Sequence, residues 1–145
     1  MKKLFKLATL LCLVLALSVS AMACSSAYKK IEKALTDIGY SVVESDSNAD
    51  KMKGESDIAV TVHVLSNKTK ANAVIVFEFK ATDDMMTFYK ESSTMRGFVK
   101  DVKDDGTAEE FYNALVEKGI AKGNCMVMSI NLFVSQEVYD AVKGA

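Results

Sequence analysis

The sequence predicts an α+β domain with two layers, in which helices pack on one face of a mostly antiparallel, four-stranded sheet. Two segments with alternating apolar residues, at 58–65 and 73–80, are separated by a short polar turn, which indicates a β-hairpin. Amphipathic helical patterns precede and follow this hairpin. An early hairpin also breaks the strand–helix–strand repeat that a parallel α/β fold requires.

Before the hairpin, the pattern predicts one helix and one short strand. The apolar residues of this helix recur at helical spacing: Tyr28, Ile31, Leu35 and Ile38. Gly39 is expected to end the helix. A strand is then expected at 40–44, followed by a polar loop at 45–57.

After the hairpin, a hydroxyl followed by two acidic residues at 82–84 predicts the start of a helix, with Thr82 as its cap. The segment 92–106 is compatible with either helix or strand. Thr107 and Glu110 form the pattern of a capping box, so a further helix is expected to begin there and to end at Gly119.

The last two predicted elements are a strand at 125–132 and a short helix. The strand has an apolar face that we expect to join the core: Met126, Met128, Ile130 and Leu132. The helix follows Ser135, which is its expected cap, and contains Val138 and Val142 at helical spacing.

Residues 1–23 have the pattern of an export signal. Three lysines within the first six residues precede an apolar run at 7–19, and Ala21 and Ala23 supply small residues near the end. As a helix, this run spans roughly 20 Å, whereas a bilayer core of about 30 Å needs about 20 residues. We therefore expect removal of 1–23 on export, leaving a single domain at 24–145 outside the cytoplasm.

Cys24 directly follows the predicted cleavage point and is the candidate site of lipid attachment. A small residue before a cysteine resembles the lipobox of bacterial lipoproteins, in which the cysteine sulfur carries a diacylglyceryl group. Ala23 fits that motif, whereas Ala21 stands where the motif prefers leucine. The ordinary signal peptidase also suits this site, and the product is then a secreted or periplasmic protein. We favour the lipidated form, which makes the membrane a partner through Cys24.

Charge and composition limit the other partners. The signal contains three lysines and no acidic residue, so 24–145 has 15 basic and 19 acidic residues and a formal charge of −4. No basic patch of the nucleic-acid type remains, and nucleic acid is not expected as a partner. Lys29, Lys30 and Lys33 follow Cys24 closely and would lie near an anionic lipid surface if Cys24 carries lipid.

Two alternatives remain for Cys125. If Cys24 is lipidated, Cys125 is an unpaired thiol, and if it is not, the two cysteines can form a disulfide in an oxidising compartment. Cys125 lies in an apolar, strand-like run, so we expect a buried and unreactive thiol.

The polar loop does not have the spacing of a calcium site. Asp46, Asn48 and Asp50 occupy alternate positions, but Lys51 stands where the EF-hand pattern requires glycine. Solvated loop residues explain this acidic cluster better than calcium ligands do.

Catalytic patterns are also weak. Nucleophilic catalysis by Cys125 would need His63, the only histidine, within hydrogen-bond reach and a third group to orient it, and nothing in the sequence predicts that arrangement. The nucleophile motif Gly-x-Ser-x-Gly does not occur. We therefore predict no enzymatic activity, no catalytic residue and no cofactor.

Four short motifs distributed over most of the mature chain are Ile38-Gly39-Tyr40, Phe77-Glu78-Phe79, Phe88-Tyr89 and Gly123-Asn124. In them the chain resembles small, functionally uncharacterised envelope lipoproteins of Gram-positive bacteria. The resemblance implies an envelope location and an α+β fold, and it carries no catalytic residue to this chain.

The sequence thus predicts an exported, lipid-anchored, non-enzymatic module that binds an envelope protein or a small ligand, or that has a structural role in the envelope. The alternative is a soft-metal protein outside the cytoplasm. Its candidate ligands are Met126, Met128 and His63, because thioether and imidazole groups suit Cu(I). Methionines that share a strand face with other apolar residues are also ordinary core residues.

Overall fold

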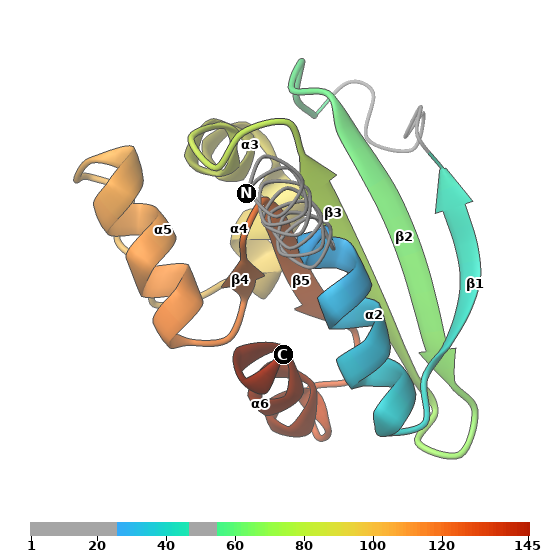
Figure 1. Ribbon diagram of the computed structural model, residues 1–145. Coiled ribbons are helices and arrows are strands. Elements are labelled where there is room, and N and C mark those ends of the chain that lie inside the picture. Colours follow the sequence, from blue (N-terminus) through green and yellow to red (C-terminus); the bar gives the residue numbers. More distant parts are fainter. Residues whose placement is uncertain (1–25, 47–54) are drawn as a thin grey trace, which may run out of the picture.

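The computed structural model describes residues 26–46 and 55–145 (Figure 1). The strands are β1 (Ser41–Asp46), β2 (Val60–Asn67), β3 (Asn72–Phe79), β4 (Ala121–Lys122) and β5 (Cys125–Ser129). The helices are α2 (Ala27–Asp37), α3 (Asp84–Glu91), α4 (Ser93–Phe98), α5 (Ala108–Glu117) and α6 (Ser135–Gly144). The predicted signal at 1–23, the lipidation candidate Cys24, and Asn48, Asp50 and Lys51 of the loop lie outside these residues.

The strands form one sheet in the order β1-β2-β3-β5-β4, and every neighbouring pair is antiparallel. The predicted hairpin is confirmed as β2–β3, in which Val60 pairs with Phe79 and Asn67 pairs with Asn72. The α+β class with an antiparallel sheet is therefore confirmed. The sheet has five strands instead of the expected four, because β4 is two residues long and too short to show an alternating pattern.

Helices contact both faces of the sheet, so the expected two-layer arrangement is not confirmed. Alternate residues of the central strands point to opposite faces and enter two different core clusters. Phe77 and Met126 pack with α3, α4 and α5, on what we call the α3–α5 face. Val76 and Val127 pack with α2 and α6, on the α2–α6 face. Figure 1 looks onto the α2–α6 face, with the fainter α4 behind the sheet.

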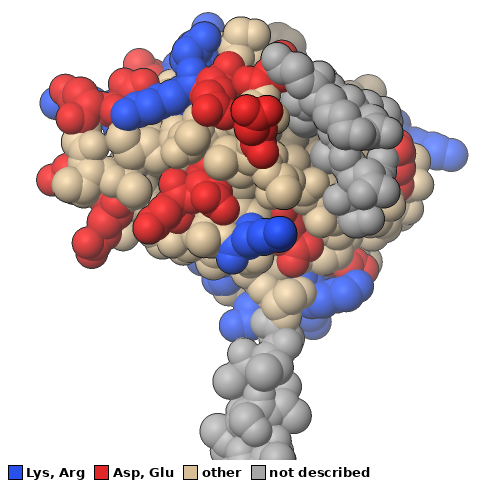
Figure 2. Space-filling view, turned by 90° about the horizontal axis from the view of Figure 1, so that it is seen from above, with Lys and Arg blue, Asp and Glu red and all other residues tan. Residues whose placement is uncertain are grey.

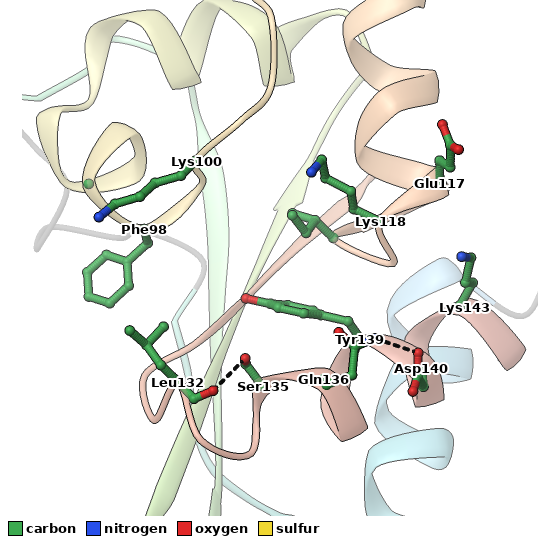
Figure 3. A pocket seen from close by; sticks show the side chains of 12 residues that line it. Phe98, Lys100, Glu117, Lys118, Leu132, Ser135, Gln136, Tyr139, Asp140 and Lys143 are labelled. Atoms are coloured by element: carbon green, nitrogen blue, oxygen red, sulfur yellow. Dashed lines mark hydrogen bonds between the residues drawn. The ribbon is translucent and has the colours of Figure 1, made fainter.

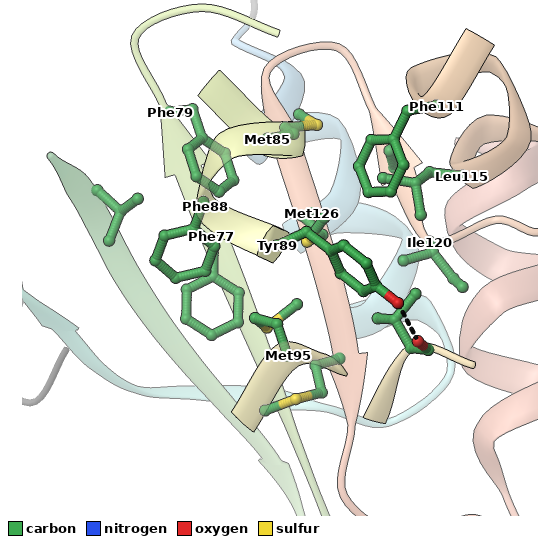
Figure 4. Close-up of a cluster of buried hydrophobic side chains, with 14 residues drawn as sticks. Phe77, Phe79, Met85, Phe88, Tyr89, Met95, Phe111, Leu115, Ile120 and Met126 are labelled. Atoms are coloured by element: carbon green, nitrogen blue, oxygen red, sulfur yellow. Dashed lines mark hydrogen bonds between the residues drawn. The ribbon is translucent and has the colours of Figure 1, made fainter. Parts of the chain in front are cut away.

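The α3–α5 face is covered by an aromatic cluster (Figure 4). The ring of Phe88 lies 5.4 Å from that of Phe77 and 5.2 Å from that of Phe79, measured between centroids. Tyr89, next to Phe88, packs on Phe111 at 5.1 Å. Because tilted and edge-on aromatic pairs add to the free energy of burial, these contacts hold α3 and α5 against the sheet.

The undecided segment at 92–106 forms α4 and then an irregular stretch. The Ser92 hydroxyl accepts a hydrogen bond from the backbone N–H of Met95 at 3.1 Å and donates to Glu55. Thr94 donates to the same carboxylate at 2.7 Å. Glu55 is distant in sequence, so the choice of helix here depends on a tertiary contact.

The capping box before α5 is confirmed. The backbone N–H of Glu110 donates to Thr107 Oγ1 at 3.2 Å, and the backbone N–H of Thr107 donates to Glu110 Oε2 at 2.8 Å. The two other expected caps are wrong. Helix α3 begins after Asp83 without a side-chain cap, and Ser135 is the first residue of α6, where its hydroxyl donates to the Leu132 carbonyl at 2.9 Å.

The strand expected at 125–132 ends earlier, at Ser129. Ile130 and Leu132 are 43% and 72% exposed, so their expected place in the core is wrong. The chain turns because the backbone N–H of Asn131 donates to the side-chain oxygen of Asn72 at 2.8 Å, in place of a sheet partner. This turn presents apolar side chains to solvent.

Candidate functional site

A groove forms where the chain turns after β5. Its walls come from the end of α4, the turn between α5 and β4, the loop at 130–134 and one side of α6, and its volume is about 480 Å³ (Figure 3). Small-molecule sites commonly have volumes of about 300–1,000 Å³. The size is therefore sufficient for a small ligand.

One part of the groove is apolar. Phe98, Ile120 and Leu132 line it, and the ring of Tyr139 lies across from Lys118 in Figure 3. Phe133, the residue after Leu132, does not line the groove and is 99% exposed. Exposed large apolar side chains are typical of a site that binds another molecule when they form one patch.

Tyr139 is held in place by the turn between α5 and β4. Gly119 has a φ of +75°, and a Cβ at this position would lie 2.2 Å from the Tyr139 carbonyl oxygen. The Tyr139 hydroxyl accepts a hydrogen bond from the backbone N–H of Ser129 at 3.4 Å. Burial raises the pKa of Tyr139 above its ordinary value of 10.0, so the ring is neutral at physiological pH.

Three lysines line the same groove: Lys100, Lys118 and Lys143. Within residues 26–46 and 55–145, no carboxylate lies at ion-pair distance from any of these ammonium groups. The helix dipole explains a cation at Lys118 and at Lys143, because they lie at the C-terminal ends of α5 and α6. It does not explain Lys100, which follows α4 by two residues.

The charged side chains are spread around the groove. In Figure 3, Lys100 extends towards the side of Phe98, Lys118 lies above the ring of Tyr139, and Lys143 lies on the other side with Glu117 and Asp140. A second hollow of about 810 Å³ adjoins that side and shares Glu117, Lys118 and Lys143 with the groove. Its other acidic residues are Asp101, Asp105 and Glu110. Figure 2 shows many acidic side chains on the side of the molecule formed by α5.

A partly buried polar chain lies on the α2–α6 face of the sheet, with His63 at its centre. Nε2 of His63 lies 2.9 Å from Glu78 Oε2, and Nδ1 lies 2.8 Å from Ser45 Oγ. Because an ionised carboxylate only accepts, Nε2 donates to Glu78, and in the neutral ring Nδ1 then accepts from Ser45. Tyr28 of α2 stacks on the imidazole at 3.5 Å.

This hydroxyl–imidazole–carboxylate order is that of a nucleophilic triad, but the surroundings favour a structural role. The imidazole is almost fully covered, since the side chain of His63 is 8% exposed, and the stacked ring of Tyr28 occupies one of its faces. We interpret the chain as the contact that fastens β1 and α2 to the centre of the sheet.

Cys125 and His63, which the sequence analysis considered as a nucleophile and its base, lie on the α2–α6 face but do not bond to each other. Cys125 pairs with Glu78 across β5 and β3, and both His63 nitrogens are taken by Glu78 and Ser45. Cys125 is 0% exposed, and burial raises the pKa of its thiol to about 12, with the charge of Glu78 as a smaller cause. The predicted burial of this thiol is confirmed. Its lack of reactivity stays a prediction, which the raised pKa supports.

The candidate soft-metal ligands are not brought together. Met126 and Met128 belong to the cluster on the α3–α5 face, whereas His63 pairs with Val76 on the α2–α6 face. The sheet therefore separates the thioethers from the imidazole. In the part of the chain that the structure describes, His, Cys, Asp and Glu side chains form no group of three that could hold a metal ion.

The groove was missed at the level of sequence because its residues come from four separate elements. The available local signal was Leu132-Phe133, an apolar pair directly after Asn131, which reads equally well as the end of a core strand. Lysines near helix ends are common and do not by themselves indicate a ligand.

Comparisons with known protein families, with curated proteins and with solved structures found no match to this chain. Among residues 26–46 and 55–145, no helix has the length and apolar character needed to cross a bilayer.

Proposed function

We propose that the protein is an exported, lipid-anchored, non-enzymatic binding module of the cell envelope, and that the groove beside α6 is its binding site. The observation that carries the binding role is the groove itself. It has the size of a small-molecule site and is lined in part by the exposed apolar side chains of Phe98 and Leu132. Exposed apolar surface of this kind stabilises a complex when a bound molecule covers it.

The anchoring role is supported by the export pattern of 1–23, by Cys24 and by the resemblance to Gram-positive lipoproteins. The position of α2 fits a tether. Ala27, its first residue, lies so close to the β4–β5 turn that a Cβ at Gly123 would be 2.5 Å from the Ala27 side chain. A lipid on Cys24 would therefore hold this end of β5 towards the membrane.

The groove loop lies at the other end of β5. Gly123 precedes this strand, and the loop at 130–134 follows it. Leu132 and Phe133 would then be presented away from the membrane that holds Cys24, towards molecules outside the cell. This orientation favours a partner or ligand in the envelope space over insertion of Phe133 into the same bilayer.

The anchor is tested by replacing Cys24 with serine in a bacterial host that processes lipoproteins. We expect the wild-type protein in the membrane fraction, with an intact mass that gives Cys24 as its first residue plus a diacylglyceryl group. The Cys24→Ser variant should lose the lipid and leave the membrane fraction. Cys125→Ser is the matched control and should remain with the membrane. Full-length chain that retains Met1 in the cytosol would overturn the proposal.

A further inference from the structure

We infer that the carboxylate of Glu55 is an acid-released clamp on α4, and that through α4 it holds Phe98 in the wall of the groove. Glu55 precedes β2, whereas α4 follows α3, so the clamp joins segments that are far apart in the sequence. The clamp itself follows from contacts within the protein, and its effect on binding rests on the proposed role of the groove.

Both oxygens of the Glu55 carboxylate accept hydrogen bonds at the start of α4. Oε1 accepts from the Thr94 hydroxyl at 2.7 Å, and Oε2 accepts from the hydroxyl of Ser92, which is 0% exposed. The Ser92 hydroxyl in turn accepts from the backbone N–H of Met95 at 3.1 Å and so caps the helix. The carboxylate therefore fixes the side chain that caps α4.

Helix α4 has little stability of its own. It is six residues long, contains Gly97 and has one buried side chain, that of Met95. Helices this short are unstable in isolation, because their few backbone hydrogen bonds do not offset the cost of nucleation. Glycine lowers the helix propensity further. The helix therefore depends on its cap and on the clamp.

The other end of α4 forms part of the groove. Gly97 and Phe98 line the cavity, and the ring of Phe98 lies on the same side as Leu132 in Figure 3. The next residue, Val99, is held separately, because it is buried and its carbonyl accepts a hydrogen bond from the Tyr89 hydroxyl at 3.1 Å. Release of the capped end should therefore loosen α4 and the Phe98 wall, and leave the chain after α4 in place.

The two bonds require an ionised carboxylate. Both of its oxygens accept, whereas protonation turns one of them into a donor, so that one of the two hydroxyl groups loses its acceptor. The hydrogen bond from Ser92, and then that from Thr94, lower the pKa of Glu55 below its ordinary value of 4.5, against an opposing effect of burial. The stabilisation by the clamp is therefore fully present above pH 4.5 and is lost as the pH falls through the folded pKa.

The segments that meet at the clamp contain four other charged side chains: Asp57, Lys90, Glu91 and Arg96. The Ser56 hydroxyl donates to Glu91, and the Arg96 guanidinium donates to the Lys90 carbonyl. The main causes of the lowered pKa of Glu55 are hydrogen bonds from hydroxyl groups and not these charges. Glu55 is thus the carboxylate whose protonation acts on the cap of α4.

A single tryptophan can report on the groove wall, because the chain has none of its own. Residues 25–145 are suitable for the test, because every residue of both core clusters lies between 27 and 142. In Phe98→Trp, acrylamide quenching of the fluorescence should increase at least 1.5-fold on acidification from pH 7, reversibly and with a midpoint below 4.5. In Phe98→Trp/Glu55→Gln, quenching should already be raised at pH 7 and should change little with pH.

Amide hydrogen exchange measures α4 without a reporter. At pH 7, Glu55→Gln should raise exchange at residues 95–98 at least tenfold and leave α5 unchanged. Asp57→Asn, which removes an exposed carboxylate two residues away, is the matched control and should behave as wild type in both measurements. Thr94→Val removes one donor and no charge, so it should move the midpoint of the quenching transition up towards pH 4.5.

Wild-type exchange in Glu55→Gln, a pH transition that persists in this variant, or an unshifted midpoint in Thr94→Val would overturn the clamp. A transition that coincides with loss of the circular dichroism signal would also overturn it, because the change would then be global unfolding. Neither measurement involves a ligand or a membrane. The proposed binding role and the anchoring tested by Cys24→Ser are therefore decided separately.

Discussion

The two faces of the sheet are built from different chemistry. The cluster on the α3–α5 face contains apolar and aromatic side chains, with Phe88 in contact with both Phe77 and Phe79. The α2–α6 face combines apolar residues with four buried polar ones: His63, Asn67, Asn72 and Ser129. Apolar burial is strong but non-directional, whereas a buried polar group is tolerated only when its partner lies at a particular place. Both faces therefore gain free energy from apolar burial, and the polar contacts of the α2–α6 face also determine how the edge strand and α2 dock.

The polar groups on the α2–α6 face are fully partnered. The side-chain amide of Asn72 donates to the Tyr40 hydroxyl at 2.7 Å and to Ser129 Oγ at 3.0 Å. Among the described residues, no buried side-chain nitrogen or oxygen lacks a hydrogen-bond partner. Networks of this kind become costly when one member is removed, because the remaining partners lose their bonds without regaining water.

The largest expected effect comes from the aromatic cluster. Phe88→Ala should lower the free energy of unfolding by about 3–5 kcal/mol, because it removes a fully buried ring and leaves a cavity. Urea unfolding of residues 25–145 measures the change. Phe133→Ala, at a position that is 99% exposed, is the control and should change stability by less than about 0.5 kcal/mol. Similar losses in both variants would contradict the packing of Phe88.

A smaller effect is expected on the other face. His63→Ala removes the bonds to Ser45 and Glu78 and the stacked contact with Tyr28, and should cost about 1–3 kcal/mol. Since these bonds fasten β1, amide hydrogen exchange should increase in β1 more than in β3 and β5. Uniform exchange throughout the sheet, or stability within about 0.5 kcal/mol of wild type, would show that the polar chain has no docking role.

The smallest effect on stability at neutral pH is expected for Cys125. The measurement here is the free energy of unfolding as a function of pH. The folded pKa is about 12, against an ordinary value of 9.0, so the folded state retains the proton more strongly. The corresponding stability is fully present below pH 9 and is lost as pH rises towards 12, by at most about 1.4 kcal/mol per pH unit. Cys125→Ala should remove this part of the loss of stability at alkaline pH. Parallel profiles between pH 9 and 11 for wild type and variant would show that the thiol is not buried as described.

The elements that the sequence predicted correctly depend on short-range signals. The hairpin follows from alternation on each side of one turn, and the capping box follows from Thr107 and Glu110, three residues apart. The caps at Thr82 and Ser135 were predicted by the same rule and were wrong, because a hydroxyl near a helix start has other acceptors, as Ser135 has in the Leu132 carbonyl. Local rules thus indicate where a helix is, and less reliably how it begins.

The candidate sites were predicted less well than the elements. Cys24 belongs to a local motif and remains a prediction. The pairing of His63 with Glu78, and the separation of His63 from Met126, depend on the order of the strands, which no local pattern contains. The groove needs α4, the end of α5 and α6 to meet beside Leu132, and these segments are far apart in the sequence.

Local spacing of apolar residues, caps and turns therefore determined the α+β class, the hairpin and most of the helices, because these depend on contacts within about one turn or one strand. Packing over long sequence separations placed helices on both faces, joined Ser45, His63 and Glu78, and left Leu132 and Phe133 exposed in the turn after β5. The physical reason is that the burial of a residue depends on which distant segments cover it, and the sum of those tertiary contacts decides that coverage.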